Sequence, residues 1–357
     1  MCTIGELTTK VGSGVTPRGG EAVYKTEGHP FVRSQNVGLG NLLLDDIAFI
    51  DEETYLRQKS TELQFNDVLL NITGASIGRS ALVDKQIVGG NVNQHVCIIR
   101  TKENLVPSFI CSFLLSNYGQ RQIDSFQAGG NRQGLNFEQI KSIKITIPSK
   151  DEQIKIAKLL RAIDERIATQ NKIIDKLQSL IKGIAQNVAR NNKPNIRLSE
   201  CLECSSSTLQ ESDVCKNGTY PVYGANGIVG YLDNYNTEKE AVYIIKDGSG
   251  VGTVSYVTGK CSATGTLNTL QAKEGYSLQY LYYMLKVFNF EPYKTGMAIP
   301  HIYFKDYGKA KIFCPSYTEQ LKYARLLSAI DNKLSAEQSI LTDLSLQKQY
   351  LLRQMFI

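Results

Sequence analysis

Two segments of the chain carry hydrophobic residues that recur at alternating steps of four and three positions. This spacing places the side chains on one stripe of an α-helix and is typical of helices that pack along a coiled-coil seam, although an ordinary core-facing helix is an alternative. The seam positions are Ile156, Leu160, Ile163, Ile167, Gln170, Ile174, Leu177, Ile181, Ile184 and Val188 in the first segment, and Tyr323, Leu327, Ile330, Leu334, Glu337, Leu341, Leu344, Lys348, Leu351 and Met355 in the second.

A polar residue stands near the middle of each stripe, Gln170 in the first and Glu337 in the second. Polar groups at seam positions fix the register of coiled coils at some cost in stability. If the two helices run antiparallel with aligned ends, Gln170 falls near Glu337 or Leu341. We therefore expect Gln170 and Glu337 to set the helix register.

Short runs of β-type residues, broken by Gly, Asn and Asp, precede each helical stripe. Strands are expected at 67–71, 93–100 and 143–147 in the first region and at 241–246, 253–257 and 309–313 in the second. One internal helix is expected in each region, near 107–116 and 277–287. Each region therefore predicts an α+β domain.

The two halves are copies of one unit. Residues 144–164 and 311–331 match at a fixed offset of 167, in the order Lys-Ile, Pro-Ser, Glu-Gln, Ala, Leu-Leu and Ala-Ile-Asp. Such a repeat indicates one structural unit present twice, and upstream the offset grows as the loops diverge. The predicted fold class is α+β, with two homologous α/β domains separated by two long antiparallel helices in a pseudo-twofold arrangement. The expected boundaries are 1–150, 151–194, 195–316 and 317–357, with Asp151 or Thr318 capping the helices.

Composition fits an ordinary globular protein. The 357 residues suffice for two domains, and no apolar run is long enough for a transmembrane helix. The N-terminus lacks the features of a signal peptide and the eight cysteines are scattered, so we expect a cytoplasmic protein with reduced thiols. The net charge of +6 is modest for a protein that binds nucleic acid alone, so a chain that does so either gathers its basic groups on one face or has a partner that supplies further phosphate contacts.

The junction between the first domain and its helix carries the most telling motif. It reads Gly129-Gly-Asn-Arg132-Gln-Gly-Leu135-Asn-Phe137-Glu-Gln-Ile140, followed by Pro148 and Glu152-Gln153. With Tyr220-Pro-Val-Tyr-Gly224-Ala-Asn-Gly227 and Thr264-Gly-Thr-Leu-Asn268, it resembles the specificity (S) subunit of type I restriction–modification enzymes over nearly the whole chain. Where the first copy has Arg132-Gln-Gly, the second has Met297-Ala-Ile-Pro300-His301, so a basic contact inferred for Arg132 does not transfer.

The resemblance implies a DNA-recognition subunit without catalysis of its own. Each of two target recognition domains would read one half of a bipartite, asymmetric site in double-stranded DNA. The helices would separate the domains, set the unread spacer and dock methyltransferase (M) subunits, expected to be two. Restriction (R) subunits would join the full complex, and we expect no membrane partner.

Catalytic signatures are missing from the sequence. It contains neither a Gly-x4-Gly-Lys-Ser/Thr loop nor the Asn/Asp-Pro-Pro-Tyr segment that marks adenine methyltransferases by resemblance. The Gly-rich loops at 74–78 and 248–252 are either tight turns or phosphate-binding loops. One Cys-x2-Cys pair, Cys201 and Cys204, is followed by Cys215, which gives half of the ligand pattern of a zinc site. These three cysteines are either structural thiols or metal ligands. We expect no catalytic residues, no metal and no cofactor.

Candidate DNA contacts are polar residues in loops, because Arg, Asn and Gln can make bidentate contacts to base edges. The alternative for each is an ordinary solvated turn residue. The candidates are Arg33, Ser34, Gln35, Asn36, Thr73, Ser76, Arg79, Asn93, Gln94, Asn131 and Arg132 in the first domain, and Tyr223, Asn226, Lys246, Ser249, Lys294 and His301 in the second.

Two other functions remain open from the residues alone. One is a recognition component for a self-contained methyltransferase–nuclease. The other is a pseudo-symmetric enzyme that binds a sugar or nucleotide at the Gly loops.

Overall fold

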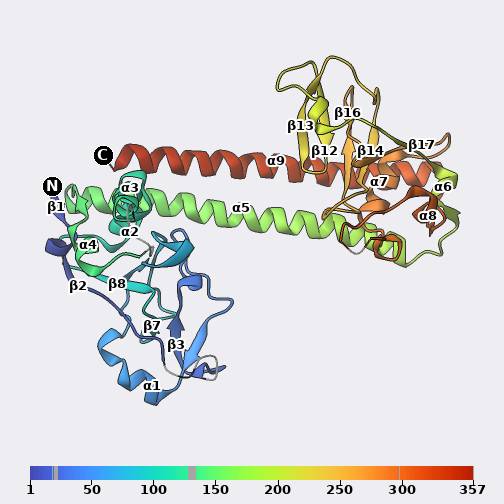
Figure 1. The fold of residues 1–357 in the computed structure, drawn as a ribbon. Coiled ribbons are helices and arrows are strands. Elements are labelled where there is room, and N and C mark those ends of the chain that lie inside the picture. Colours follow the sequence, from blue (N-terminus) through green and yellow to red (C-terminus); the bar gives the residue numbers. More distant parts are fainter. Residues whose placement is uncertain (18, 20–22, 128–133, 297, 357) are drawn as a thin grey trace. The chain divides into compact units, whose positions relative to one another are not determined.

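The computed structural model of the chain describes all residues except 18, 20–22, 128–133, 297 and 357. Its internal contacts divide it into two compact units. Unit 1 comprises Met1–Asn171 and Ile340–Ile357, and unit 2 comprises Lys172–Ser339. Each unit holds one mixed α/β domain together with part of both long helices (Figure 1).

The domain of unit 1 is built on two small sheets. A four-stranded antiparallel sheet has the order β2-β8-β5-β6, and a three-stranded sheet has the order β4-β3-β7 with β3 and β7 parallel. The strands are β1 Cys2–Thr3, β2 Thr8–Ser13, β3 His29–Val32, β4 Ala48–Ile50, β5 Val68–Asn71, β6 Ser80–Leu82, β7 Asn91–Val92, β8 Val96–Thr101 and β9 Lys144–Ile145. The helices are α1 Glu52–Arg57, α2 Pro107–Leu115, α3 Asn117–Ser125 and α4 Phe137–Ser142.

The domain of unit 2 repeats this topology. Its four-stranded sheet has the order β11-β17-β14-β15, and its three-stranded sheet has the order β13-β12-β16 with β12 and β16 parallel. The strands are β10 Ile196–Arg197, β11 Leu202–Ser206, β12 Tyr220–Gly224, β13 Gly227–Leu232, β14 Ala241–Ile245, β15 Val254–Val257, β16 Ser262–Ala263, β17 Leu267–Ala272 and β18 Lys311–Ile312. The helices are α6 Leu198–Cys201, α7 Leu278–Lys286 and α8 Phe304–Tyr307. The prediction of two homologous domains is confirmed.

A short strand pair closes each domain where it meets the long helices. In unit 1, β1 pairs with β9 through Cys2 and Ile145, so the start of the domain lies beside its end. In unit 2, β10 pairs with β18 through Ile196 and Ile312. The first and last strands of each domain therefore meet in a single two-residue antiparallel pair.

The two long helices are α5 Lys150–Arg190, with 41 residues, and α9 Tyr317–Met355, with 39 residues. Every predicted seam position in both helices is buried or half-buried, which confirms the helical periodicity. Both polar seam residues are buried, Gln170 at 7% exposure and Glu337 at 6%. Glu337 also forms an ion pair with Lys333 one turn earlier in α9.

The prediction that Asp151 and Thr318 cap the long helices is wrong. Both lie inside the first turn, and the helices begin after Ser149 and Ser316 instead. The Ser149 hydroxyl donates to Glu152 Oε2 at 2.8 Å, and the Ser316 hydroxyl donates to Glu319 Oε2 at 2.8 Å. The glutamate three residues after each serine thus completes the helix start, because a carboxylate accepts from donors at a helix N-terminus.

The glutamine beside each of these glutamates ties the helix to its domain. Gln153 is 1% exposed, and its Oε1 accepts from the Val106 N–H at 2.9 Å, just before α2. Gln320 is 2% exposed, and its Oε1 accepts from the Ser277 N–H at 2.9 Å, just before α7. The Glu-Gln pair of the repeat therefore has one structural role in both copies.

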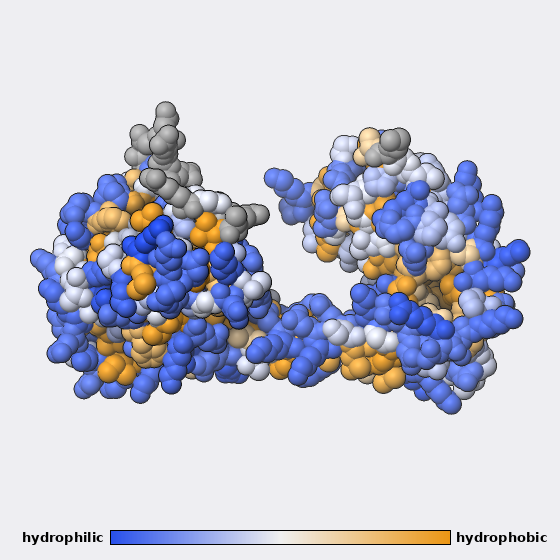
Figure 2. Space-filling model, turned by 90° about the horizontal axis from the view of Figure 1, so that it is seen from below, coloured by the Kyte–Doolittle hydropathy of each residue, from blue (hydrophilic) through white to orange (hydrophobic). Residues whose placement is uncertain are grey.

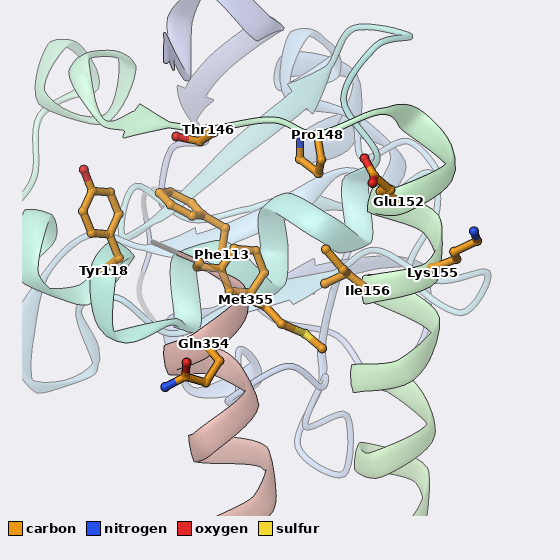
Figure 3. A pocket seen from close by; sticks show the side chains of 10 residues that line it. Phe113, Tyr118, Thr146, Pro148, Glu152, Lys155, Ile156, Gln354 and Met355 are labelled. Atoms are coloured by element: carbon orange, nitrogen blue, oxygen red, sulfur yellow. The ribbon is translucent and has the colours of Figure 1, made fainter.

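Within unit 1 the start of α5 lies against the end of α9, so these two segments are antiparallel. Lys348 Nζ of α9 lies 2.5 Å from Asp164 Oδ1 of α5. Phe356 is buried with its ring centroid 5.2 Å from that of Phe109 in α2. A cavity of about 480 Å³ opens beside this packing, with Phe113, Ile156 and Met355 among its lining residues (Figure 3).

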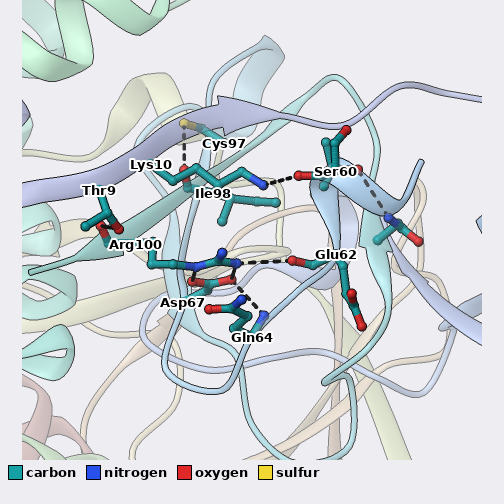
Figure 4. A network of polar contacts seen from close by, with 11 residues as sticks. Thr9, Lys10, Ser60, Glu62, Gln64, Asp67, Cys97, Ile98 and Arg100 are labelled. Carbon is teal, nitrogen blue, oxygen red and sulfur yellow. Dashed lines mark hydrogen bonds and ion pairs between the residues drawn. The ribbon is translucent and has the colours of Figure 1, made fainter. Parts of the chain in front are cut away.

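An ion pair between a half-buried arginine and a buried aspartate joins two strands of the larger sheet of unit 1. Arg100 of β8 makes two contacts of 2.7 Å with Asp67, whose side chain is 1% exposed (Figure 4). The hydrogen bonds that Arg100 donates to the Asp67 carboxylate raise the pKa of Arg100. Burial and the nearby guanidinium lower the pKa of Lys10, whose ammonium donates to the Ser60 carbonyl at 2.6 Å. This network joins β2 and β8 to the segment that leads into β5.

Candidate nucleic-acid interface

Three loop segments of unit 1 meet at one end of its two sheets. Asn71, at the end of β5, donates through Nδ2 to the Ser34 carbonyl at 2.8 Å and to Ser76 Oγ at 3.1 Å. The Asn93 N–H donates to the Val32 carbonyl at 3.1 Å. The structure thus brings together the candidates that follow β3, β5 and β7, although they are far apart in sequence.

The exposure of these candidates separates them into three groups. Gln35, Arg79 and Gln94 are exposed, and Arg33, Ser34, Thr73 and Ser76 are half-buried. Asn36 and Asn93 are buried. The Asn36 amide donates to the carbonyls of Leu43 and Asp46, and Asn93 Oδ1 accepts from the His95 N–H, so both asparagines hold the loop backbone.

Asp46 engages two of the candidates and was missed by the sequence reasoning. Arg33 Nη2 donates to the Asp46 carbonyl at 2.7 Å and to its carboxylate at 3.1 Å, and Gln35 donates to the same carboxylate. The Arg33 guanidinium also lies over the Tyr24 ring, 5.4 Å from its centroid. These contacts orient Arg33 and Gln35 at the loop cluster.

His95 is a second member that the sequence reasoning missed. Its Nδ1 lies 2.6 Å from Thr73 Oγ1, and its Nε2 lies 3.0 Å from Gln94 Nε2. Gln94 Oε1 accepts from the Thr16 N–H at 3.0 Å. His95 therefore joins two of the candidates, Thr73 and Gln94, in one polar chain.

The remaining candidates of the first domain, Asn131 and Arg132, lie outside the described residues. The segment that follows them enters the same cluster. Thr73 and Gly134 form an antiparallel bridge, and the Leu135 N–H donates to the Ile72 carbonyl at 2.8 Å.

Unit 2 assembles the same cluster from the corresponding segments. The Lys246 N–H donates to the Thr266 carbonyl at 3.0 Å, and the Lys246 carbonyl accepts from the Ile302 N–H at 2.9 Å. The Thr264 N–H donates to the Tyr223 carbonyl at 2.9 Å. The candidates Tyr223, Lys246, Ser249 and His301 are thus carried by connected segments.

The side chains of the second cluster differ from those of the first. Asn226 and Ser249 are exposed, whereas Tyr223, Lys246, Lys294 and His301 are half-buried. Lys294 forms an ion pair with Glu291 at 2.6 Å, and His301 Nδ1 lies 2.6 Å from Asp247 Oδ1. Asp247 was also missed, although its place immediately before the Gly loop is a local signal.

The Gly loops are tight turns between strands. Gly74, Gly78, Gly248 and Gly252 have φ angles of 71°, 85°, 96° and 90°, a region that favours glycine. The first loop joins β5 to β6 and the second joins β14 to β15. A dinucleotide site requires a strand, a loop and a helix in succession, so the structure favours the turn interpretation.

The cysteines are free thiols. Burial raises the pKa of Cys97 to about 12 and that of Cys111 to about 11. Cys201 is buried while Cys215 is exposed. Among the residues that the structure describes, no three His, Cys, Asp or Glu side chains gather as they would around a metal ion.

No helix in the described part of the chain combines the length and apolar character needed to cross a lipid bilayer. In Figure 2 the domain of unit 1, on the left, presents a mainly hydrophilic face broken by small groups of hydrophobic residues.

Comparisons with known proteins place this geometry in context. Residues 1–179 and 194–345 match the model of the type I restriction modification DNA specificity domain. A putative type I specificity subunit from Mycoplasma genitalium is 25% identical over 320 residues, which cover 82% of this chain and 81% of the relative. The EcoKI specificity subunit of Escherichia coli K12 is 23% identical over 200 residues, covering 53% of this chain and 41% of the relative.

Two solved structures share the fold. The S subunit of a type I restriction–modification system from M. genitalium has a TM-score of 0.69 at 19% identity, covering 99% of this chain and 95% of the other. A chain from a study of complex assembly in the type I system has a TM-score of 0.56 at 17% identity, covering 98% and 95%.

Proposed function

The chain belongs to the type I restriction–modification DNA specificity family, and we propose that each of its two domains reads one half of a bipartite site in double-stranded DNA. The observation that carries this proposal is the pair of loop clusters. Both are held by equivalent backbone hydrogen bonds at the ends of equivalent strands, while their side chains differ. Two domains with equivalent backbones and different loop side chains are suited to recognise two different DNA sequences.

The exposed members of each cluster are the strongest candidates for base contacts. In the first domain they are Gln35, Arg79 and Gln94, and in the second Asn226 and Ser249. Amide and guanidinium groups can make paired hydrogen bonds to base edges in the major groove. We assign the buried Asn36 and Asn93 to loop support, because their amides already bond to the backbone.

The long helices are the proposed docking surface for M subunits. Leu159 and Leu326 are 45% and 51% exposed, and they occupy equivalent positions of the repeat. Ile173 and Ile340 are also equivalent, at 36% and 42%. Unit 1 thus exposes Leu159 and Ile340, and unit 2 exposes Leu326 and Ile173. Two equivalent apolar sets favour two copies of one partner.

The proposed assembly assigns the chemistry to other chains. The M subunits would methylate, R subunits would join the full complex, and this chain would act as a non-catalytic recognition subunit in the cytoplasm. A net charge of +6 is modest for tight DNA binding, so the M subunits would supply further phosphate contacts.

A domain exchange tests the reading of half-sites. Residues 195–316 are replaced by the corresponding domain of another specificity subunit, and the methylated motif is determined by methylome sequencing in cells that express the M subunit. One half of the motif should change while the other stays. A change in both halves would contradict the proposal, and copurification of a separate methyltransferase without nuclease would exclude a fused methyltransferase–nuclease partner.

An insertion tests the proposed role of the helices in setting the spacer. One heptad added to both α5 and α9 lengthens each helix by roughly 10 Å, at about 1.5 Å per residue. The unread gap of the motif should grow by about three base pairs, at roughly 3.4 Å each. A gap that does not respond to helix length would contradict this role.

A further inference from the structure

The two domains place an imidazole at the same point of their loop clusters, but they take it from different segments of the chain. The sequence has three histidines. Two of them contact the residue that stands two positions after the central strand of the cluster. In the first domain His95 contacts Thr73, which follows β5, and in the second His301 contacts Asp247, which follows β14.

Backbone hydrogen bonds establish that Thr73 and Asp247 are equivalent. The N–H of Ile72 bonds to the His95 carbonyl, and the N–H of Lys246 bonds to the Thr266 carbonyl, both at 3.0 Å. Thr73 forms an antiparallel bridge with Gly134, and Asp247 forms the same bridge with His301.

The same equivalences show that the two histidines are not copies of one another. The counterpart of His95 in the second domain is Thr266, and the counterpart of His301 in the first domain is Gly134. Each domain has a small residue where the other has its imidazole. The space beside Thr73 and Asp247 is therefore filled by one ring in each domain, supplied from a different segment of the chain.

The tautomer of His95 follows from its neighbours. Gln94 Oε1 accepts from the Thr16 N–H, so the Gln94 amide nitrogen faces the imidazole and donates to His95 Nε2. His95 Nδ1 then carries the proton and donates to Thr73 Oγ1 at 2.6 Å. This series of hydrogen bonds holds the exposed Gln94 amide in one orientation.

In the second domain the contact between His301 and Asp247 leaves the Nε2 atom of His301 available. His301 Nδ1 donates to Asp247 Oδ1 at 2.6 Å, which fixes the ring plane, and both side chains are about one-third exposed at 35% and 36%. Its Nε2 is thereby directed away from Asp247. A base edge offers donors and acceptors that a fixed imidazole nitrogen and a neighbouring carboxylate can distinguish.

We propose that these two couples help to determine base specificity, with His95 as a positioning residue for Gln94 in the first half-site and His301 as a direct base contact in the second. The inference rests on the proposed function and names residues within it. It also explains how two domains with equivalent backbones can recognise two different half-sites. The first domain presents an amide held by an imidazole, and the second presents the imidazole itself beside a carboxylate.

Asparagine substitutions test the two roles. In His95→Asn and His301→Asn the side-chain amide can still donate to Thr73 or Asp247 from the place of Nδ1, but the Nε2 atom is lost. Each variant is expressed with its M subunit, and methylation rates are measured on DNA duplexes with single base changes across the motif. His95→Asn should lower discrimination about tenfold or more at a position of the first half only, and His301→Asn at a position of the second half only.

His29→Asn is the matched control. His29 stacks on Tyr55 and contacts Glu52 at the opposite end of β3 from Arg33, so its replacement should leave the motif unchanged. The unaffected half-site reports correct folding and assembly of each variant.

Three results would overturn the inference. They are an unchanged motif, relaxation in both halves, and a uniform loss of methylation without altered base preference, which would indicate a phosphate contact or a structural role. A wild-type complex that methylates no split motif would instead overturn the proposed function, and the inference with it.

Discussion

The Gln320 side-chain carbonyl accepts a hydrogen bond from the Ser277 N–H at 2.9 Å, and this contact anchors α9 to the start of α7. The Gln320 amide also donates to the Pro315 carbonyl at 2.9 Å. The long helix is therefore joined to its domain by a buried polar side chain as well as by apolar packing.

Replacing Gln320 with Leu should lower the free energy of unfolding by about 1–3 kcal/mol, because the Ser277 N–H loses its acceptor in a buried site. Gln153→Leu should have a similar effect in unit 1, and the two effects should add because the residues share no partner in the contacts described above. Urea unfolding of the isolated chain measures both. Gln347→Leu, at an exposed position of α9, should change little, and equal losses in all three variants would contradict a specific anchor.

Asp67→Ala should destabilise unit 1 by about 1.5–3 kcal/mol, because it leaves the half-buried Arg100 charge without its carboxylate. The double variant Asp67→Leu with Arg100→Met should recover much of this loss, since it removes both charges. Thermal unfolding tests the comparison. The exposed pair of Glu53 and Arg57 provides a control in which removal of the carboxylate should have little effect.

Replacing Gln170 and Glu337 together with Leu should raise the melting temperature, since both are buried at seam positions. The same change should relax the register of the helices, because polar seam residues specify register. The methylated motif would then tolerate more than one gap length. A lower melting temperature with a strictly unchanged gap would contradict the register prediction.

The stability of the chain should fall at alkaline pH. Burial raises the pKa of Cys111 to about 11, above the value near 8.5 of an unfolded thiol. The stabilisation from keeping this thiol neutral is fully present below about pH 8.5 and is lost as the pH rises through about 11.

Urea unfolding at pH 8 and pH 10 should show the loss, at about 1.4 kcal/mol per pH unit for this thiol. Cys111→Ala should reduce the slope, whereas Cys215→Ala, at an exposed position, should leave it unchanged. A Cys111→Ala slope identical to the wild type would exclude this thiol as a source.

The long helices and their seams could be predicted from local periodicity. The alternating steps of four and three residues can be recognised in one helix without knowing the segment that it packs against. The serine caps were also visible as Ser-x-x-Glu, but Asp151 and Thr318 competed as capping residues by type alone. The couples His95–Thr73 and His301–Asp247 join residues 22 and 54 positions apart. Only the folded loops bring them together, so sequence spacing could not reveal them.

The antiparallel pairs β1–β9 and β10–β18 have a consequence for how such a protein can change. Because each domain starts and ends at one pair, a genetic crossover at its two ends would transplant an intact cassette. The incoming domain needs only a matching two-residue strand pair and a backbone N–H placed to donate to the glutamine of the existing helix. New recognition sequences could thus arise by recombination of whole domains, without compensating mutations in the long helices.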